Sequence, residues 1–129
     1  MLLVYYSTST GNTEYFINKI GLRNKKMPLS GSLEVNEPYI LVFPSYGGGR
    51  LKGIVPAGVK NFLEIRCNVE NLRGVIGSGD RNYGDYFALG SKIVAEKFNV
   101  PLLYRYEIKG TEKDYINVRN GVINFGKQR

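Results

Sequence analysis

The 129-residue sequence contains no histidine, no tryptophan and a single cysteine, Cys67. Without histidine, the chain cannot carry a Ser-His or Cys-His nucleophile pair or an imidazole metal site. One cysteine excludes an internal disulfide, a dithiol redox motif and a cysteine-rich zinc site. Because few side chains remain for redox or acid–base work, we expect any chemistry of that kind to come from a bound cofactor.

The sequence also lacks a long hydrophobic run. Its apolar stretches fall far short of the roughly 20 residues that span a bilayer. The first four residues, Met1-Leu2-Leu3-Val4, are apolar, but they are too few for a signal peptide and carry no basic leader. We therefore expect a cytoplasmic protein that does not associate with a membrane.

Nothing in the composition divides the chain. Its length is usual for one domain and suffices to bury a core without disulfides or a structural metal. The apolar fraction of 43% and the charged fraction of 22% are typical of a folded globular protein. No linker or internal repeat is visible, so we expect a single domain over residues 1–129.

Short apolar runs alternate with segments of helical spacing. Continuous apolar runs are typical of strands buried on both faces. Apolar residues spaced three and four apart are typical of helices, and Thr111 with Asp114 resembles a capping box. The alternation predicts an α/β fold, a parallel sheet with helices on both faces. The predicted strands are 2–6, 39–43, 74–77 and 102–108, with a fifth at 28–30, and the predicted helices are 16–20, 59–63, 86–97 and 115–125.

In such a fold, ligands bind beyond the carboxyl ends of the strands, so the loops after the apolar runs are the candidate sites. The first loop is rich in hydroxyl residues and leads directly into a predicted helix. A helix N-terminus with free N–H groups suits a phosphate, and the absence of lysine argues against a nucleoside-triphosphate loop. The alternative is a simple helix cap, for which one Ser or Thr would suffice. The candidate phosphate-binding residues are Ser7, Thr8, Ser9, Thr10, Gly11, Asn12 and Thr13.

The loop after the second run contains three consecutive glycines, which allow a backbone to approach a ligand closely. Tyr46, just before them, offers a flat ring for stacking. The alternative is an ordinary surface loop. The candidate residues here are Ser45, Tyr46, Gly47, Gly48 and Gly49, followed by Arg50 and Lys52.

The loop after the third run combines glycines, side-chain amides and aromatics. Its glycine spacing does not complete a dinucleotide-binding fingerprint. Phe87, at its end, is expected to lie in the core. The candidate site residues are Gly79, Asn82, Tyr83 and Gly84, with Arg81 as a nearby charge.

At these residues the sequence resembles the flavodoxins. Thr10-Gly11-Asn12-Thr13 matches their phosphate loop, and Gly77-x-Gly79-Asp80-x-x-Tyr83 matches the segment beside their flavin ring. A closer resemblance is to the NrdI family, the flavodoxin-like proteins of class Ib ribonucleotide reductase. It is carried by Ser45-Tyr46-Gly47-Gly48-Gly49, Leu72-Arg73-Gly74-Val75-Ile76, Gly79 with Arg81-Asn82-Tyr83-Gly84, Val100 to Arg105, and Thr111 with Asn117 to Val122, and so covers almost the whole chain.

The resemblance implies a doubly wound sheet of five strands in the order 2-1-3-4-5 and FMN as the cofactor. Residues 7–13 would bind the phosphate, Ser45 to Gly49 would line the flavin ring, and Gly79, Asn82, Tyr83 and Gly84 would form its other wall. The reduced flavin would react with O₂ to give superoxide. The implied partners are the small subunit of a class Ib reductase, which receives superoxide to assemble its dimanganese-tyrosyl radical, and a reductase or other flavin reductant. The alternatives are a general electron-carrier flavodoxin and a flavin-free binding module.

The net charge is +7, with 18 Lys and Arg against 11 Asp and Glu. Nucleic-acid binding is one interpretation of this charge, but the sequence contains no recognition motif or basic helix, which argues against it. Near a flavin, Arg50, Lys52 and Arg81 would favour the anionic reduced form. At an effective dielectric of about 20, unit charges about 8 Å apart interact by about 2 kcal/mol. We therefore expect full reduction to be easier than in acidic flavodoxins.

Overall fold

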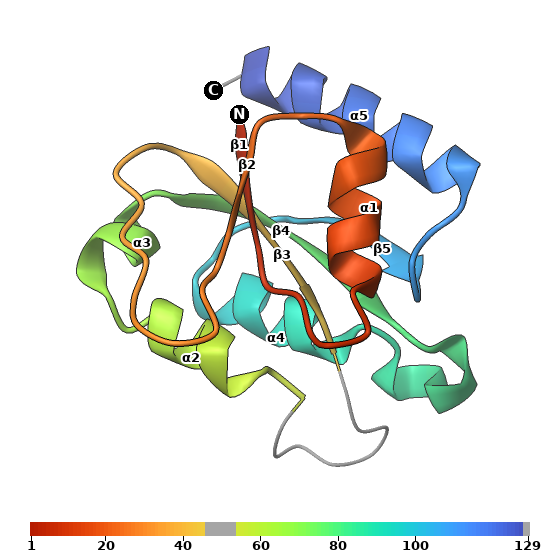
Figure 1. Ribbon diagram of the computed structural model, residues 1–129, viewed down its shortest axis with the longest axis horizontal. Coiled ribbons are helices and arrows are strands. Elements are labelled where there is room, and N and C mark those ends of the chain that lie inside the picture. The colour runs from red at the N-terminus through yellow and green to blue at the C-terminus, as the bar shows by residue number, and fades with distance from the viewer. Residues whose placement is uncertain (46–53, 128–129) are drawn as a thin grey trace.

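The computed structural model describes residues 1–45 and 54–127, and these form an α/β fold around one sheet (Figure 1). The sheet has five strands in the order β2-β1-β3-β4-β5, and every neighbouring pair is parallel. This order confirms the predicted doubly wound fold. The strands are β1 Leu2–Tyr5, β2 Asn24–Lys26, β3 Tyr39–Pro44, β4 Leu72–Gly79 and β5 Leu102–Glu107.

Helices cover both faces of the sheet. One face carries α1 and α5, which lie side by side in Figure 1, and the other carries α2 and α4. A short 3-10 helix, η1, joins β4 to α4. The bounds are α1 Asn12–Ile20, α2 Ala57–Phe62, α3 Arg66–Glu70, η1 Arg81–Tyr86, α4 Leu89–Lys97 and α5 Glu112–Lys127.

The central strand shows why the apolar runs predicted strands correctly. Every residue of β3 is buried, and successive side chains alternate between the two faces. Ile40 and Val42 join the core under α1 and α5, whereas Leu41 and Phe43 join the core under α2 and α4. A strand that must fill two cores has no polar position, which explains its continuous apolar sequence.

The predicted fifth strand at residues 28–30 is wrong. The edge strand is β2, Asn24–Lys26, and all three of its residues are exposed. Within the described residues it pairs only with β1, with Asn24 opposite Leu3 and Lys26 opposite Tyr5. An edge strand with polar side chains has no apolar pattern to reveal it, and lysines there disfavour pairing with another chain.

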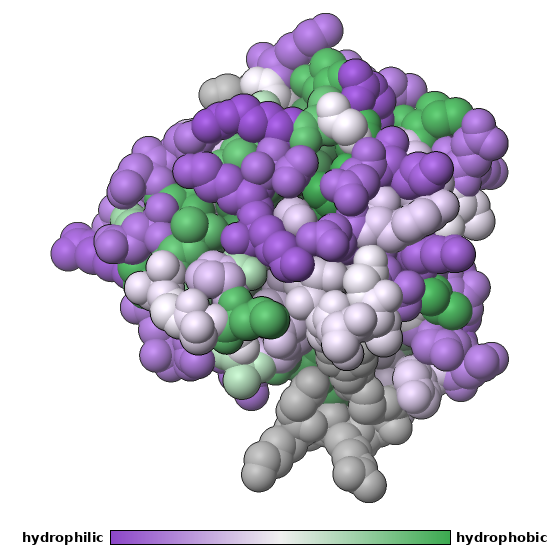
Figure 2. Space-filling view, viewed as in Figure 1, coloured by the Kyte–Doolittle hydropathy of each residue, from purple (hydrophilic) through white to green (hydrophobic). Residues whose placement is uncertain are grey.

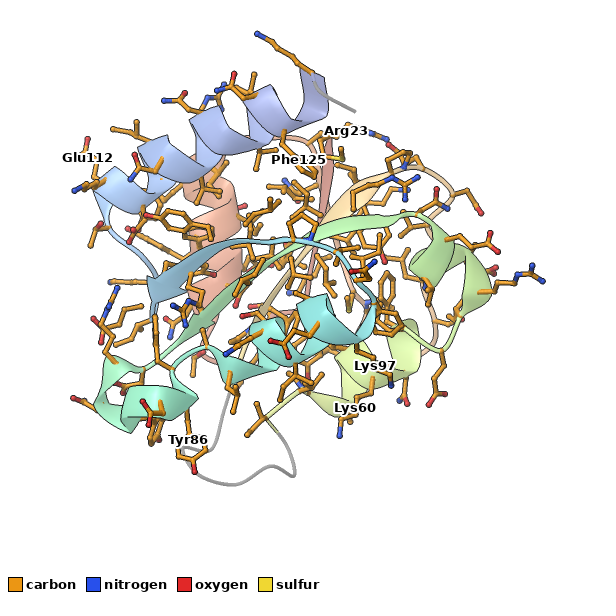
Figure 3. All side chains as sticks on the ribbon, turned by 180° about the vertical axis from the view of Figure 1, so that it is seen from behind. Arg23, Lys60, Tyr86, Lys97, Glu112 and Phe125 are labelled. Carbon is orange, nitrogen blue, oxygen red and sulfur yellow. The ribbon has the colours of Figure 1, made fainter. Side chains whose placement is uncertain are left out.

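The third predicted helix, 86–97, begins too early. Tyr86 belongs to η1 and is 41% exposed, and Figure 3 shows it projecting from η1, apart from α4. The buried residues of α4 are Gly90, Ser91, Val94 and Ala95. Three of these four residues are small, so the spacing of large apolar residues does not mark the buried face, and the predicted boundary was wrong.

Small residues are required where α4 crosses β4. A Cβ added at Gly77 of β4 would lie 2.0 Å from the Ser91 Oγ and 2.2 Å from its Cβ. The Ser91 hydroxyl is itself buried and donates a hydrogen bond to the Ala88 carbonyl, 2.6 Å away. The close approach of α4 therefore depends on a glycine in the strand.

Candidate functional site

The carboxyl ends of β1, β3 and β4 surround a cavity of about 280 Å³. Six of the predicted site residues line it, from three loops that are distant in sequence: Thr10, Asn12, Thr13, Ser45, Gly79 and Tyr83. Four further residues complete the lining, namely Pro44, Ser78, Asp80 and Ile108. Of these, Pro44 and Ser78 are strand residues, and Ile108 follows β5, whose end carries no motif in the sequence.

The β1–α1 loop places its residues in two ways. Gly11 precedes α1 with a φ of +73°, a left-handed conformation that favours glycine. It has no side chain to cap the helix, so the positive dipole end of α1 is left to attract an anion. The buried Ser7 hydroxyl accepts a hydrogen bond from the Glu14 N–H at 3.3 Å. Ser7 thus supports the helix and does not line the cavity.

Two hydroxyl groups of the β1–α1 loop lie close together near Gly11. The Thr8 and Thr10 hydroxyl oxygens are 3.0 Å apart, and the Gly11 N–H donates to the Thr8 carbonyl at 2.9 Å. Thr13 is buried with 2% exposure, whereas Ser9 is exposed. The loop is therefore closed by its own hydrogen bonds and presents Thr10, Asn12 and Thr13 to the cavity.

At the end of β3, Ser45 connects the site to α4. Its hydroxyl accepts a hydrogen bond from the Gly90 N–H at 2.8 Å, and its own N–H donates to the Ser78 carbonyl at 2.9 Å. The predicted residues that follow, Tyr46 to Gly49 with Arg50 and Lys52, lie outside the described residues.

The β4–α4 connection forms the exposed wall of the cavity. Asp80 accepts a hydrogen bond from the Asn82 N–H at 2.9 Å and so starts η1. Gly84 has a φ of +57° and a ψ of −119°, which a side chain would strain. Tyr83 is 47% exposed and lines the cavity, where its ring is available to stack on a flat ligand. Asn82 and Gly84 are exposed and shape the turn from outside the cavity.

Phe87 is only half-buried, so its expected place in the core is wrong. Two guanidinium groups lie over its ring, that of Arg81 at 4.7 Å from the centroid and that of Arg105 at 5.6 Å. Glu107 opposes this charge, since its Oε1 lies 3.9 Å from the Arg81 Nε and its Oε2 accepts from the Arg81 N–H at 3.2 Å. Arg105 and Glu107 belong to β5, where no motif marks them, so they could not be added to the charges around the site from the sequence.

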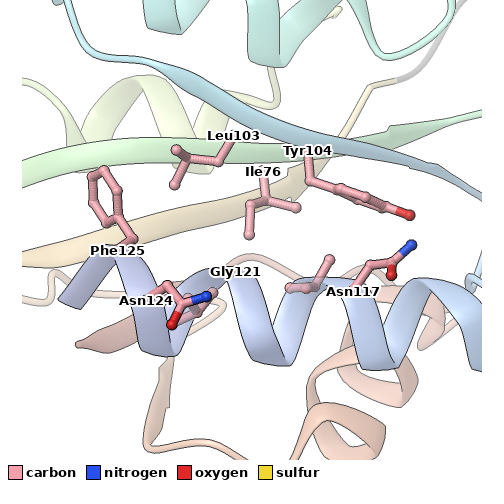
Figure 4. Close-up of a pocket in the computed structure, with 9 residues that line it drawn as sticks. Ile76, Leu103, Tyr104, Asn117, Gly121, Asn124 and Phe125 are labelled. Carbon is pink, nitrogen blue, oxygen red and sulfur yellow. The ribbon is translucent and has the colours of Figure 1, made fainter. Parts of the chain in front are cut away.

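A second cavity, of about 210 Å³, lies between α5 and the sheet (Figure 4). Ile76, Leu103 and Phe125 make most of its wall apolar, and its polar side chains include Asn117 and Asn124 of α5. None of the predicted site residues within 1–45 and 54–127 lines it. This cavity is a gap under an amphipathic helix, whereas the first cavity collects hydroxyls and a helix N-terminus.

The residues of the first cavity fit a flavin mononucleotide. The hydroxyls of Thr10, Thr13 and Ser78 and the N-terminus of α1 supply donors for a phosphate. Pro44, Tyr83 and Ile108 supply the apolar and aromatic surface that a flat ring requires. No lysine or arginine lines the cavity among the described residues, so neutral donors and the helix dipole would bind the anion.

Comparison with known proteins identifies the family. A family model described as "NrdI Flavodoxin like" matches residues 4–120. The chain belongs to the NrdI flavodoxin-like family. It is 50% identical to Protein NrdI of Bartonella tribocorum over 131 residues, covering 98% of this chain and 97% of that protein. It is 46% identical to Protein NrdI of Brucella ovis, covering 96% and 93%.

Solved structures agree with the fold. Oxidised flavodoxin 2 from Bacillus cereus matches with a TM-score of 0.66 and 21% identity, over 99% of both chains. A short-chain flavodoxin associated with a non-canonical PDU bacterial microcompartment matches with a TM-score of 0.64 and 14% identity, over 96% of both chains. At these identities the two structures support the flavodoxin-like fold alone.

Membership of the NrdI family confirms the resemblance seen in the sequence. It makes FMN the cofactor of this chain and places the protein in the ribonucleotide reductase system. Within residues 1–45 and 54–127, no helix is both long enough and apolar enough to cross a membrane.

Proposed function

We propose that this NrdI-family protein holds FMN in the 280 Å³ cavity and serves the small subunit of a class Ib ribonucleotide reductase. When bound and reduced, FMN supplies one electron for each O₂ that becomes superoxide. The superoxide then reaches the small subunit and helps to assemble or maintain its dimanganese-tyrosyl radical. A reductase or another flavin reductant restores the electrons. One observation supports the proposal most strongly: phosphate donors and an exposed aromatic ring line the same cavity of a NrdI-family chain.

In this proposal each wall of the cavity has a separate task. Thr10, Asn12 and Thr13 hold the phosphate at the N-terminus of α1, within the loop closed by Thr8 and Gly11. Tyr83 stacks on the flavin ring, and the turn at Gly84 keeps it there. The predicted contacts of Ser45 to Gly49 along the ring complete the assignment.

Positive charge near the ring supports the proposed chemistry. Arg81 and Arg105 lie together over Phe87, at the end of the sheet that holds the cavity. A cation near the ring favours the anionic reduced flavin and retains the superoxide anion near the protein. Glu107 and Asp80 reduce the local potential, so the expected effect on the flavin is modest.

General electron transfer is the second candidate function. It is favoured by the segment Gly77-x-Gly79-Asp80-x-x-Tyr83, which resembles that of ordinary flavodoxins. An electron carrier would need no manganese partner. The two functions therefore differ in what the reduced protein does beside a manganese-loaded small subunit.

Two measurements test the proposal in order. Purified protein should show flavin absorbance at one FMN per chain, whereas a flavin-free binding module would show none. The reduced, FMN-loaded protein should then form superoxide from O₂ faster in the presence of a manganese-loaded class Ib small subunit. A rate that does not change when the subunit is added would instead favour the general electron carrier.

Replacing Asn12 and Thr13 together by leucine should release FMN. The change removes an amide and a hydroxyl from the cavity lining and places apolar groups at the N-terminus of α1. We expect the purified variant to lose most of its flavin absorbance while keeping its circular dichroism spectrum. Asn36→Leu, at an exposed residue away from the cavity lining, is the control and should keep its flavin. Stoichiometric FMN in the double variant would contradict the phosphate assignment.

A further inference from the structure

Behind the cavity lies a hydroxyl group that the site described above does not use. Tyr106, on β5, is 1% exposed. Its hydroxyl is buried and has no hydrogen-bond partner among the described residues. A hydroxyl left in this way loses its bonds to water without replacement, which destabilises the folded chain. Such a group calls for an explanation.

The sheet determines where this hydroxyl lies. Tyr106 is paired with Ser78 of the neighbouring strand, so the two side chains stand next to each other on one face of the sheet. On that face the Tyr106 ring stacks on Phe16 of α1, with 3.6 Å between the ring centroids and 5° between the ring planes. This stacking fixes the ring beneath the first turns of α1 and leaves the hydroxyl no freedom to reach solvent.

Two hydroxyls that line the cavity adjoin the Tyr106 hydroxyl. They belong to Ser78 and Thr13, both buried. Burial raises the pKa of Tyr106, and the neighbouring Ser78 and Thr13 hydroxyls act in the opposite direction. Tyr106 therefore stays a neutral hydroxyl at physiological pH, with a proton to donate and the cavity lining next to it.

We propose that Tyr106 is a positioning residue for the phosphate end of the ligand, acting through Thr13. A hydroxyl has one proton and can accept from another donor. If the Tyr106 hydroxyl donates to the Thr13 oxygen, the Thr13 proton is left to point into the cavity, toward a phosphate oxygen. The bond forms fully when the ligand is bound, which explains why the hydroxyl has no partner without it. The inference rests on the proposed FMN site and adds to it a residue behind the cavity wall.

The structure supports this role over a purely structural one. A tyrosine that only filled the core would gain nothing from its hydroxyl, because phenylalanine would stack on Phe16 equally well. The hydroxyl also lies beside Thr13, the buried residue of the β1–α1 loop that lines the cavity. Functional sites often contain groups that lower the stability of the folded protein. The unpartnered hydroxyl next to Thr13 is such a group.

The test compares FMN with riboflavin, which has the same ring and no phosphate. In Tyr106→Phe we expect the Kd of FMN to rise about fivefold, which corresponds to about 1 kcal/mol, and the Kd of riboflavin to stay unchanged. We also expect the ligand-free variant to be at least as stable as the wild type, because the substitution removes an unpartnered buried hydroxyl. A structural role would instead weaken both ligands equally.

Tyr104→Phe is the matched control. Tyr104 lies two residues earlier on β5, and its hydroxyl donates to the Asp114 Oδ1 at 2.6 Å. Its loss should lower stability and leave the ratio of the two Kd values unchanged. An unchanged ratio in Tyr106→Phe would overturn the proposal.

A measurement on the unaltered protein avoids any effect of substitution on folding. By proton NMR, the Tyr106 hydroxyl proton should exchange slowly enough to be observed when FMN is bound, and not when riboflavin is bound. The same signal with both ligands would overturn the proposal. Failure of the wild type to bind FMN at all would overturn the proposed function instead, so the two failures are distinguishable.

Discussion

At the scale of single residues, one buried amide holds a connection that lacks regular structure. Asn68 is fully buried, and its Oδ1 accepts from the Val35 N–H at 2.7 Å. Its Nδ2 donates to the carbonyls of Leu33 at 2.8 Å and Phe62 at 2.9 Å. One side chain thus ties the segment before β3 to the end of α2, and no apolar pattern in the sequence points to it.

Asn68→Ala should lower the free energy of unfolding by about 3 kcal/mol, because it leaves several buried backbone groups without partners. Chemical denaturation measures this loss. Asn124→Ala, at an exposed position of α5, should change stability by no more than about 0.5 kcal/mol. Equal effects of the two substitutions would show that the Asn68 bonds are not needed.

Buried tyrosines predict a loss of stability in alkali. Burial, together with the Glu14 carboxylate, raises the pKa of Tyr5 to about 12, and burial also raises the pKa of Tyr39. Tyrosines in the unfolded chain ionise near pH 10, so above that pH the unfolded state loses protons that the folded state keeps. The free energy of unfolding should therefore fall as the pH rises from about 10 to 12.

Tyr5→Phe tests this directly. Denaturation at several pH values should show a shallower decline between about pH 10 and 12 than in the wild type. Tyr86→Phe, at an exposed tyrosine, should keep the wild-type slope. A Tyr5→Phe slope equal to that of the wild type would contradict the assignment.

At the scale of elements, the sequence correctly predicted the strands and helices that have a clear pattern of apolar residues. The strands under both helical layers and the capping box of α5 are confirmed, the latter by the Thr111 N–H, which donates to the Asp114 Oδ2 at 2.8 Å. The predicted fifth strand lay at residues 28–30 instead of at β2, and the predicted third helix began too early. Both errors arise because β2 is polar and the buried face of α4 consists mostly of small residues, so neither shows a regular pattern of large apolar residues. In the site, the loops after β1 and β4 were predicted from motifs, whereas Ile108 and Tyr106 come from β5 and its end, which carry no motif.

The contact between β4 and α4 should leave no room for a methyl group added at Gly77. Gly77→Ala would place a Cβ against Ser91, and we expect a loss of about 1–3 kcal/mol, typical of overpacking. Ser91→Gly in the same chain should recover part of the loss, since it removes the Cβ and Oγ that clash. Denaturation of the two single variants and the double variant measures this coupling, and purely additive effects would contradict the assigned contact.

At the scale of the whole molecule, the +7 charge distinguishes this chain from an acidic electron carrier. The face in Figure 2 is mainly hydrophilic, with small apolar patches between polar side chains. A basic surface of this kind steers an acidic partner by long-range attraction and needs no large apolar interface. The cavity proposed for the cofactor lies at the carboxyl ends of the strands. The bound cofactor, and not a catalytic side chain, would supply the redox chemistry there.

Association with the small subunit should therefore depend on salt. We expect the association rate to fall at least severalfold between low and high ionic strength, because screening shortens the range of attraction. Stopped-flow mixing at several salt concentrations measures this rate. A rate independent of salt would indicate that the net charge does not serve partner binding.

In the proposed function, the reduced protein supplies the oxidant for a manganese-tyrosyl radical. Electron paramagnetic resonance tests it most directly: the reduced, FMN-loaded protein is mixed with a manganese(II)-loaded class Ib small subunit, and O₂ is then admitted. We predict a tyrosyl radical signal that appears with this protein and not with an equal amount of a reduced, acidic flavodoxin. Equal radical yields for the two proteins, or no radical with either, would show that this protein does not supply the oxidant.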